Sequence, residues 1–335
     1  MKVLVLFDLD RHVEPDESFT LKALRKEEQK PTEADVISCL RGLGHEVETL
    51  AVYDDVREMI DRIKTVAPDV VFNLCESFFL DRSHEPNIPA LLDLMKVRYT
   101  GAGPDSLLLC KDKALTKKLL SFHHVRVAGF RVSTKTHPLR RLARFRFPAF
   151  VKPVAEEGSD GISKASFVKN EAEAIERATF IHEKIGSDAL IEEYIEGREL
   201  TVGVVGNPRP LTLPPRETFF GKAETDEHAP HFATARAKFD DAYRRKWGIR
   251  NGAPDPLPDG VAEKLARTAR LAYRILKVRG LVRLDVRLSA DNDVFVIEVN
   301  PNPSLARGDD IAATAKEAGI EYEQLIQRIL DNALR

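Results

Sequence analysis

A predicted β-hairpin over residues 283–300 constrains the fold of this chain more than any other segment. Its first strand alternates apolar and charged side chains, the period-two pattern of a strand with one buried face. Its second strand ends on Glu298 and Asn300, where further apolar residues would be expected. Polar groups at such positions indicate a binding site, and the alternative is a solvated face of an antiparallel sheet.

We predict the register of this hairpin by assuming a two-residue turn at Asp291 and Asn292. Asp285 then lies opposite Glu298, and Arg283 lies opposite Asn300. The second strand is predicted to have two faces, one with Val294, Val296, Glu298 and Asn300, the other with Phe295, Ile297 and Val299. Two facing carboxylates repel each other unless a cation lies between them. Oxygen ligands of this kind suit Mg²⁺, which also binds phosphate oxygens.

Length and composition predict a soluble globular protein of two or three domains. The chain has 335 residues, of which 43% are hydrophobic and 31% charged. A net charge of −2 argues against nucleic acid or an anionic membrane as a partner. We see no apolar run long enough for a transmembrane helix and no signal peptide. The three cysteines are widely spaced and odd in number, which fits a reducing cytoplasm.

The first hundred residues are predicted to form a parallel sheet. Strands at residues 3–7, 46–53 and 70–74 alternate with amphipathic segments, as in a βαβαβ unit. Polar side chains follow the first and third strands, where such sheets carry their sites: Asp8, Asp10, Arg11, Cys75, Glu76 and Ser77. They equally fit the usual polarity of loops. No G-x-G-x-x-G motif follows the first strand, which argues against a dinucleotide site.

Two later segments add further signals. A glycine- and serine-containing loop joins predicted strands at residues 149–152 and 165–168, and its backbone could cradle a phosphate, although an ordinary hairpin turn has the same composition. Residues 206–258 look irregular, with many prolines and charges, and include Lys238. A segment of this length in a compact domain is either a functional lid or partly disordered.

The order of these signals resembles the ATP-grasp superfamily and, within it, the D-alanine–D-alanine ligase family. The resemblance spans nearly the whole chain and is strongest at residues 99–120, 151–163, 190–204 and 280–304. It implies an α/β (α+β) ATP-grasp fold. An N-terminal parallel-sheet domain (1–108) would precede two α+β subdomains (109–195 and 196–335) that clasp ATP. The last of these would carry the lid (about 206–258) and the metal hairpin.

The resemblance also implies roles for individual residues. Phosphate contacts fall to Lys113, Lys152, the lid lysine Lys238 and a flap containing Glu157, Gly158, Ser159 and Gly161. Adenine and ribose contacts fall to Glu192, Glu193, Ile195 and Glu199. The metal ligands would be Asp285, Glu298 and Asn300, holding two Mg²⁺ ions, with Mn²⁺ as an alternative. Arg283 would stabilise the oxyanion, so the catalytic set is Arg283, Lys238 and Lys152.

The substrate end departs from the family pattern, in the loops at residues 7–13, 75–86 and 301–310. We therefore expect a ligase that joins an amino-acid or peptide-like acid to an amine through an acyl phosphate, with substrates other than two D-alanines. The candidate substrate contacts are Asp10, Glu76, Arg283, Ser304, Arg307 and Asp309, with Arg307 facing a carboxylate and Asp309 or Asp310 an amine. The alternatives are a phosphotransferase, a true D-alanine–D-alanine ligase and a non-catalytic ATP-binding protein. A homodimer is expected from the resemblance alone.

Overall fold

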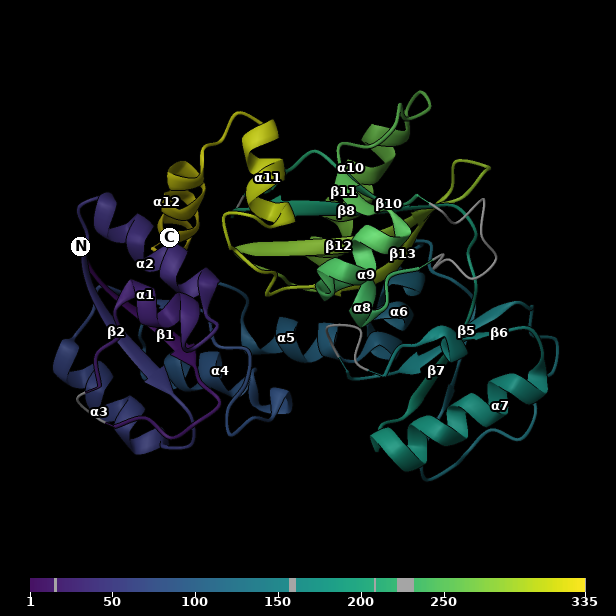
Figure 1. Ribbon diagram of the computed structural model, residues 1–335, viewed down its shortest axis with the longest axis horizontal. Coiled ribbons are helices and arrows are strands. Elements are labelled where there is room, and N and C mark those ends of the chain that lie inside the picture. The colour runs from purple at the N-terminus through teal and green to yellow at the C-terminus, as the bar shows by residue number, and fades with distance from the viewer. Residues whose placement is uncertain (15–16, 157–160, 208, 222–231, 335) are drawn as a thin grey trace.

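The structure is a computed structural model that describes residues 1–14, 17–156, 161–207, 209–221 and 232–334. Within these residues the strands form three sheets, of three, four and six strands. The first sheet lies on the left of Figure 1, and the other two face each other on the right. The fold is mixed α/β, as the sequence predicts.

The first sheet is parallel, with the order β2-β1-β3, which confirms the predicted βαβαβ unit. Residues 3–8 of its central strand are buried, as expected for a parallel sheet with helices on both faces. The elements of this part are β1 (Lys2–Asp8), α1 (Leu21–Lys26), α2 (Pro31–Gly42), β2 (Glu46–Val52), α3 (Val56–Val66), β3 (Val70–Asn73), η1 (Arg82–His84) and α4 (Asn87–Leu94).

The four-stranded sheet has the order β4-β7-β5-β6 and is covered by α7. The predicted strand at 165–168 is shorter than expected, because a helical turn occupies its first residues. The elements from α5 onward are α5 (Pro104–Lys111), α6 (Lys113–Phe122), β4 (Phe130–Ser133), β5 (Ala149–Pro153), η2 (Lys164–Ser166), β6 (Phe167–Val168), α7 (Glu171–Phe180), η3 (Ile181–Ile185) and β7 (Ala189–Glu193).

The six-stranded sheet carries the hairpin and contains much of the segment predicted to be irregular. Its path is β11-β10-β8-β12-β13, with β9 paired to β8. Its elements are β8 (Arg198–Val205), β9 (Leu211–Thr212), β10 (Arg216–Phe220), α8 (Ala235–Phe239), α9 (Asp241–Trp247), β11 (Ile249–Gly252), α10 (Val261–Ile275), β12 (Leu281–Leu288) and β13 (Val294–Asn300). The sequence pattern did not reveal these short strands and helices, because the many prolines interrupt the periodicity of this segment.

The hairpin of β12 and β13 has the predicted pairs at its open end and a different register near its turn. Asp285 pairs with Glu298 and Arg283 with Asn300, but Val286 pairs with Val296. The extra residue, Ile297, is a β-bulge, which turns the following side chains to the other face. The predicted two-residue turn is wrong. The Ser289 N–H donates to the Asp293 carbonyl at 3.0 Å, so three residues, 290–292, form the turn.

The bulge also corrects the predicted faces of the second strand. Val294 and Val296 are 2% and 1% exposed and lie in the apolar core with Val299, not beside Glu298. The three valines therefore share the core face, while Ile297 and Glu298 both line the candidate cavity. A bulge beside a site is a common way to redirect side chains.

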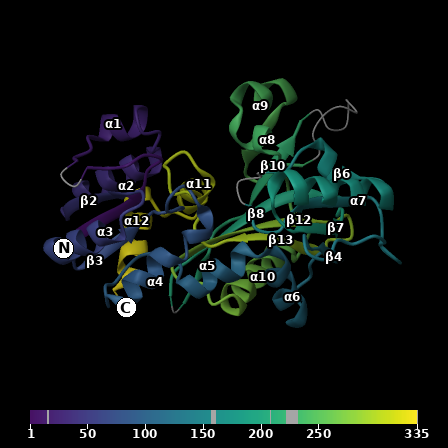
Figure 2. The ribbon, with the colours of Figure 1, turned by 90° about the horizontal axis from the view of Figure 1, so that it is seen from below.

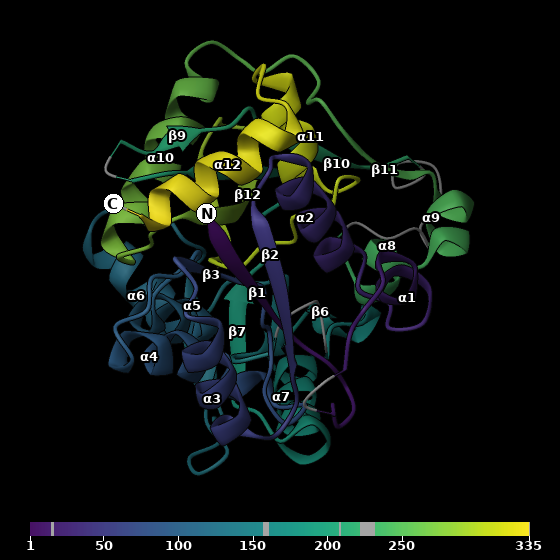
Figure 3. The same ribbon diagram turned by 90° about the vertical axis from the view of Figure 1, so that its left-hand side faces the viewer.

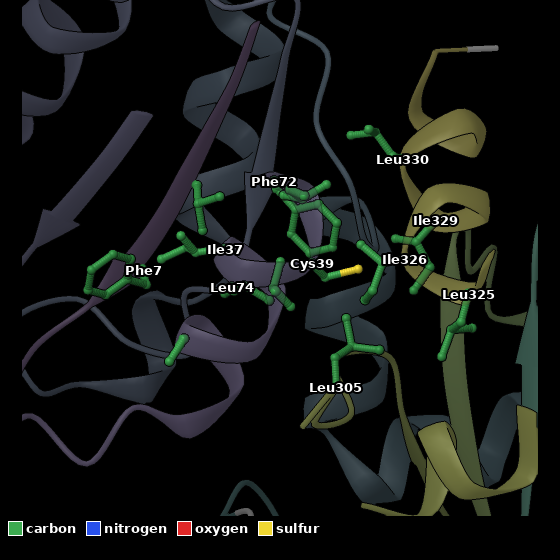
Figure 4. Close-up of a cluster of buried hydrophobic side chains, with 14 of the residues drawn as sticks. Phe7, Ile37, Cys39, Phe72, Leu74, Leu305, Leu325, Ile326, Ile329 and Leu330 are labelled. Atoms are coloured by element: carbon green, nitrogen blue, oxygen red, sulfur yellow. The ribbon is translucent and has the colours of Figure 1, made fainter. Parts of the chain in front are cut away.

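The C-terminal helices return to the first sheet. α11 (Asp310–Glu317) and α12 (Tyr322–Ala333) follow the hairpin, and α12 packs beside α2 (Figure 3). Figure 4 shows the core that results, in which Leu325, Ile326 and Ile329 of α12 face Phe72 of β3. The segment after β13 is thereby fixed to the first sheet. Among the described residues, no helix is long and apolar enough to span a membrane.

Candidate active site

The polar face of the hairpin forms the centre of the candidate site. Arg283 binds Asp285 in a two-pronged ion pair, with Nε–Oδ1 at 2.8 Å and Nη2–Oδ2 at 3.0 Å. Both side chains are largely buried, at 24% and 17% exposure. Asp285 is the main reason that the pKa of Arg283 is raised, so this guanidinium stays charged. The arrangement keeps a fixed cation beside two facing carboxylates.

Lys113 reaches the second carboxylate from the start of α6. The Asp112 side chain caps this helix by accepting from the Leu115 N–H at 2.8 Å, which sets where the helix begins. Lys113 Nζ lies 3.2 Å from Glu298 Oε1 and donates to the Glu156 carbonyl. The lysine therefore bridges the hairpin and the segment that leads into the predicted flap.

Several cations converge on Glu298. Burial by itself raises the pKa of this carboxyl group, but the pKa is lowered to about 2 by Lys113, Lys152, Lys238 and Arg283, in that order. Four predicted site residues from separate parts of the sequence thus act on one carboxylate. Converging charges that shift a pKa are typical of functional sites, although structural ion pairs have the same effect.

A buried triad lies behind these residues. Glu192 Oε1 is 2.7 Å from Lys152 Nζ, and Glu192 Oε2 is 2.9 Å from Lys117 Nζ. All three side chains are at most 4% exposed. Burial raises the pKa of Glu192, but Lys117 and Lys152 outweigh it and lower the pKa below its ordinary value. Glu192, predicted to meet adenine, is engaged by two ammonium groups here.

Lys117 is a site residue that the sequence reading missed. Its ammonium also donates to the Val296 carbonyl at 3.3 Å, so it joins α6, β7 and β13. It lies four residues after Lys113, and therefore on the same face of α6. The sequence feature that could have identified Lys117 was its position four residues after Lys113, on the same face of a buried helix.

A cavity of about 90 Å³ separates the four-stranded sheet from the hairpin. This volume is well below that of typical ligand pockets, since the rings of Phe150 and Phe232 meet there with centroids 4.7 Å apart. The predicted residues that line it are Lys152, Glu192, Glu193, Ile195, Glu199, Lys238, Asp285 and Glu298. We expect the two rings to separate when a nucleotide enters.

Glu199 lines this cavity and is paired with a second residue that the sequence reading missed. Arg287 Nη2 is 2.9 Å from Glu199 Oε2, and Arg287 Nη1 donates to the Gly197 carbonyl at 3.0 Å. Arg287 is the next charged residue on the polar face of β12 after Asp285. Glu199, predicted to bind ribose hydroxyl groups, is thereby held in place beside the cavity.

The predicted flap is described only in part. Glu157, Gly158 and Ser159 lie outside the described residues. Gly161 has φ +72°, and a Cβ there would lie 2.6 Å from Ile185 Cδ1. Its carbonyl accepts from Arg177 Nη2 at 2.5 Å. The glycine is thus required by the backbone and by close packing at this point of the chain.

The candidate substrate residues are not all brought together. Asp10 is exposed, and the Arg307 side chain is engaged by residues of α12. Its guanidinium lies 2.7 Å from Glu323 and 4.1 Å from the ring centre of Tyr322. This pairing gives Arg307 a structural contact on α12, which the sequence could not show because Arg307 lies in a turn and its partner is 16 residues away on that helix.

The remaining substrate candidates lie where the hairpin meets the first sheet. Ser304 Oγ is 3.1 Å from Thr32 Oγ1, and the Asp309 backbone precedes α11 as its N-cap. The Glu76 N–H donates to Asp8 Oδ1 at 2.9 Å, and Lys30 lies 3.7 Å from the same oxygen. These contacts gather Glu76 and Ser304 near this junction.

The residues present fit a magnesium ion. Asp285, Glu298 and Asn300 offer oxygen ligands on one face of the hairpin. Among the described residues, no group of three or more His, Cys, Asp or Glu side chains is placed to hold a metal. Mg²⁺ usually takes one or two carboxylates and completes its shell with water and substrate phosphates, so a complete protein cage is not needed.

Comparisons with known proteins identify the family of this chain. Residues 113–331 match the family model described as "D-ala D-ala ligase C-terminus". A D-alanine–D-alanine ligase from Gluconobacter oxydans is 31% identical over 299 residues, covering 89% of this chain and 91% of that protein. An uncharacterized protein, y4sG, from Sinorhizobium fredii is 30% identical over 311 residues, covering 90% and 86%.

Solved structures give the same fold. The D-alanine–D-alanine ligase from Bacillus anthracis complexed with ATP superimposes with a TM-score of 0.73 at 21% identity, covering 100% of this chain and 98% of that one. These findings define an ATP-grasp fold. The chain belongs to the D-alanine–D-alanine ligase-like family of ATP-grasp enzymes. It is accordingly an ATP-dependent ligase that forms a carbon–nitrogen bond, in a family that uses ATP and Mg²⁺.

The lowered pKa of Glu298 predicts a pH-dependent stability. A carboxylate with a folded-state pKa near 2, against 4.5 ordinarily, stabilises the fold above pH 4.5 and loses this effect as the pH falls to 2. Glu298→Gln should therefore unfold more easily than the native chain by about 2 kcal/mol at pH 6, and the difference should shrink towards pH 2. Urea unfolding of both proteins measures it, with the exposed Glu196→Gln as control. A constant difference across this range would contradict the assignment.

Proposed function

We propose that this protein activates a carboxylic acid with ATP as an acyl phosphate and joins it to an amine, releasing ADP and phosphate. One observation carries the proposal. Lys152 and Lys238 line the same cavity as Asp285 and Glu298, and Lys113 and Arg283 contact these two carboxylates. A polyphosphate entering this cavity meets fixed positive charge and two carboxylates suited to Mg²⁺.

We assign a role to each residue from its position. Lys113, Lys152 and Lys238 hold the phosphates, and Asp285, Glu298 and Asn300 hold the metal, with two ions as the proposed number. When bound, Mg²⁺ would neutralise charge on the transferring phosphoryl group. Glu193, Ile195 and Glu199 also line the cavity, and we assign the nucleoside to them. The proposed domains are residues 1–108, 109–195 and 196–335.

The reaction proceeds in two steps. An oxygen of the acid attacks the γ-phosphorus, the bond to ADP breaks, and an acyl phosphate forms. The amine then attacks the acyl carbon, and phosphate leaves with the attacking oxygen while the amine gives up a proton. Arg283 stabilises the negative charge on the tetrahedral carbon's oxygen. Closure of the lid keeps water from the acyl phosphate.

The substrates we propose are an amino-acid or peptide-like acid and an amine, other than a D-alanine pair. Support comes from the substrate end, where the loops at 7–13, 75–86 and 301–310 depart from the family pattern. In this chain the junction is built from Asp8, Lys30 and Glu76, with Ser304 bound to Thr32. A homodimer, expected from the resemblance, and a cytoplasmic location, expected from the cysteine pattern, belong to the same proposal.

The second candidate is a true D-alanine–D-alanine ligase, because relatives of 26% to 31% identity carry that name. Phosphate release from ATP, measured over pairs of amino acids and amines with mass detection of the product, separates the possibilities. Turnover that needs both an acid and an amine supports the ligase, and a product of two D-alanines favours the second candidate. A stably phosphorylated substrate would instead indicate a phosphotransferase.

A further inference from the structure

The described part of the lid is connected to the substrate side by a chain of polar contacts that the catalytic roles above do not use. It begins at Arg244 on α9, whose Nη1 donates to the Ala237 carbonyl at 2.6 Å. Ala237 is the residue before Lys238 on α8 and is 2% exposed. Arg244 therefore holds α8 at the point from which Lys238 reaches the cavity. Figure 2 shows α8 and α9 as a pair beside β10.

The second link is Asn251 on β11. Its Oδ1 accepts from Arg244 Nη2 at 3.1 Å, and its Nδ2 donates to Asp310 Oδ2 at 3.1 Å. Asn251 is a suitable intermediate because an amide both accepts and donates, so it can join a cation to an anion. Without it, Arg244 and Asp310 would have no common partner among these contacts.

The third link is Asp310, the first residue of α11. Arg216 of β10 pairs with it at 3.0 Å, and these side chains are only 15% and 24% exposed. Asp310 follows the segment that runs from the metal ligand Asn300 along the first sheet. That segment is fixed by Asn302, whose Nδ2 donates to the Cys75 carbonyl at 3.1 Å. The chain of contacts thus joins the lid helices to the substrate-side junction.

We propose that Asp310, Asn251 and Arg244 form a positioning relay that fixes α8 and α9, and with them Lys238, over the nucleotide cavity. Asp310, a sequence candidate for an amine contact, is paired here with Arg216 and Asn251, so we assign all three residues to positioning Lys238 and to the exclusion of water. The inference rests on the proposed function. It predicts that loosening the relay lets water reach the acyl phosphate, so phosphate is released without amide.

Trp247 provides a readout that does not depend on turnover. It is the only tryptophan in the chain, it lies three residues after Arg244 at the end of α9, and it is 8% exposed. In Arg244→Met and Asn251→Leu, the acrylamide quenching constant of its fluorescence should rise about twofold or more, because α8 is released from α9 and the cluster of Ala237, Trp247 and Ile249 opens. Arg245→Met removes the same charge from an exposed position on α9 and should leave quenching unchanged.

Activity then tests the consequence for chemistry. With a substrate pair from the screen, the yield of amide per phosphate should fall about threefold or more in both relay variants and remain unchanged in Arg245→Met. The double variant should be no worse than either single one, because the links act in series. Should Arg244→Met fail to fold, Arg244→Lys, which reaches only one of the two acceptors, should show a smaller rise in quenching.

The two readouts separate the inference from the function on which it rests. Unchanged quenching in folded Arg244→Met and Asn251→Leu would overturn the relay, as would strictly additive effects in the double variant. A higher quenching constant with an unchanged amide yield would overturn the role of the relay in positioning Lys238. If no acid and amine pair is turned over by the native protein, the proposed function fails, while quenching still decides whether the relay holds the lid helices.

Discussion

Glu298→Ala should lower kcat by about a thousandfold or more while the chain remains folded at neutral pH. Glu298 faces Asp285 across the hairpin. Its pKa is lowered by the positive charges of Lys113, Lys152, Lys238 and Arg283. Its removal takes away a proposed metal ligand and leaves these cations facing one another. Steady-state phosphate release measures the loss, and far-UV circular dichroism with thermal melting checks the fold.

The control for this change is Glu196→Ala, which removes an exposed glutamate from the loop between β7 and β8. It should keep kcat within about twofold of the native value, since exposed charges contribute little. Full activity in folded Glu298→Ala would refute the metal assignment. Equal losses in both variants would show that a general charge effect, not this position, is responsible.

Glu192→Gln should destabilise the protein by about 3–5 kcal/mol, because it leaves two buried ammonium groups without their carboxylate. Lys117 and Lys152 each lie within 3 Å of Glu192 oxygens, and the three side chains are nearly inaccessible to water. Lys117→Met should be much milder, since one lysine and one glutamate remain paired. Urea unfolding at neutral pH gives both values.

The order of these two effects is the informative result. A larger loss in Lys117→Met than in Glu192→Gln would contradict the account of one carboxylate neutralising two cations. Losses below about 1 kcal/mol in both would show that the triad contributes little to stability. Nucleotide affinity should fall in Glu192→Gln as well, because Lys152 would no longer be held at the cavity.

The hairpin shows how far sequence patterns reach. The alternation of polar and apolar residues correctly identified the polar face of β12. It also gave the correct partners Asp285 and Glu298 at the open end of the hairpin. It misplaced Val294 and Val296, since a single inserted residue, Ile297, changes which side chains share a face. A bulge leaves no clear mark in one sequence, so the correct pairs followed from an incorrect turn.

Contacts between distant segments were the least predictable part. Arg307 was predicted to be a substrate residue and is held by Glu323, while Lys117 was not singled out in the sequence and is buried against Glu192. Which charges meet depends on how α6, β7 and α12 pack, and periodicity within one element does not determine this. Motif order, by contrast, follows the chain and therefore led to the correct family.

The central claim is that the acid is activated through an acyl phosphate, and the fate of its carboxylate oxygen tests it most directly. The acid found by the screen, labelled with ¹⁸O in both carboxylate oxygens, is turned over with ATP, Mg²⁺ and the amine. Mass spectrometry of the phosphate then follows the label. One ¹⁸O atom should appear in the released phosphate for each amide formed. Unlabelled phosphate alongside amide would contradict the mechanism.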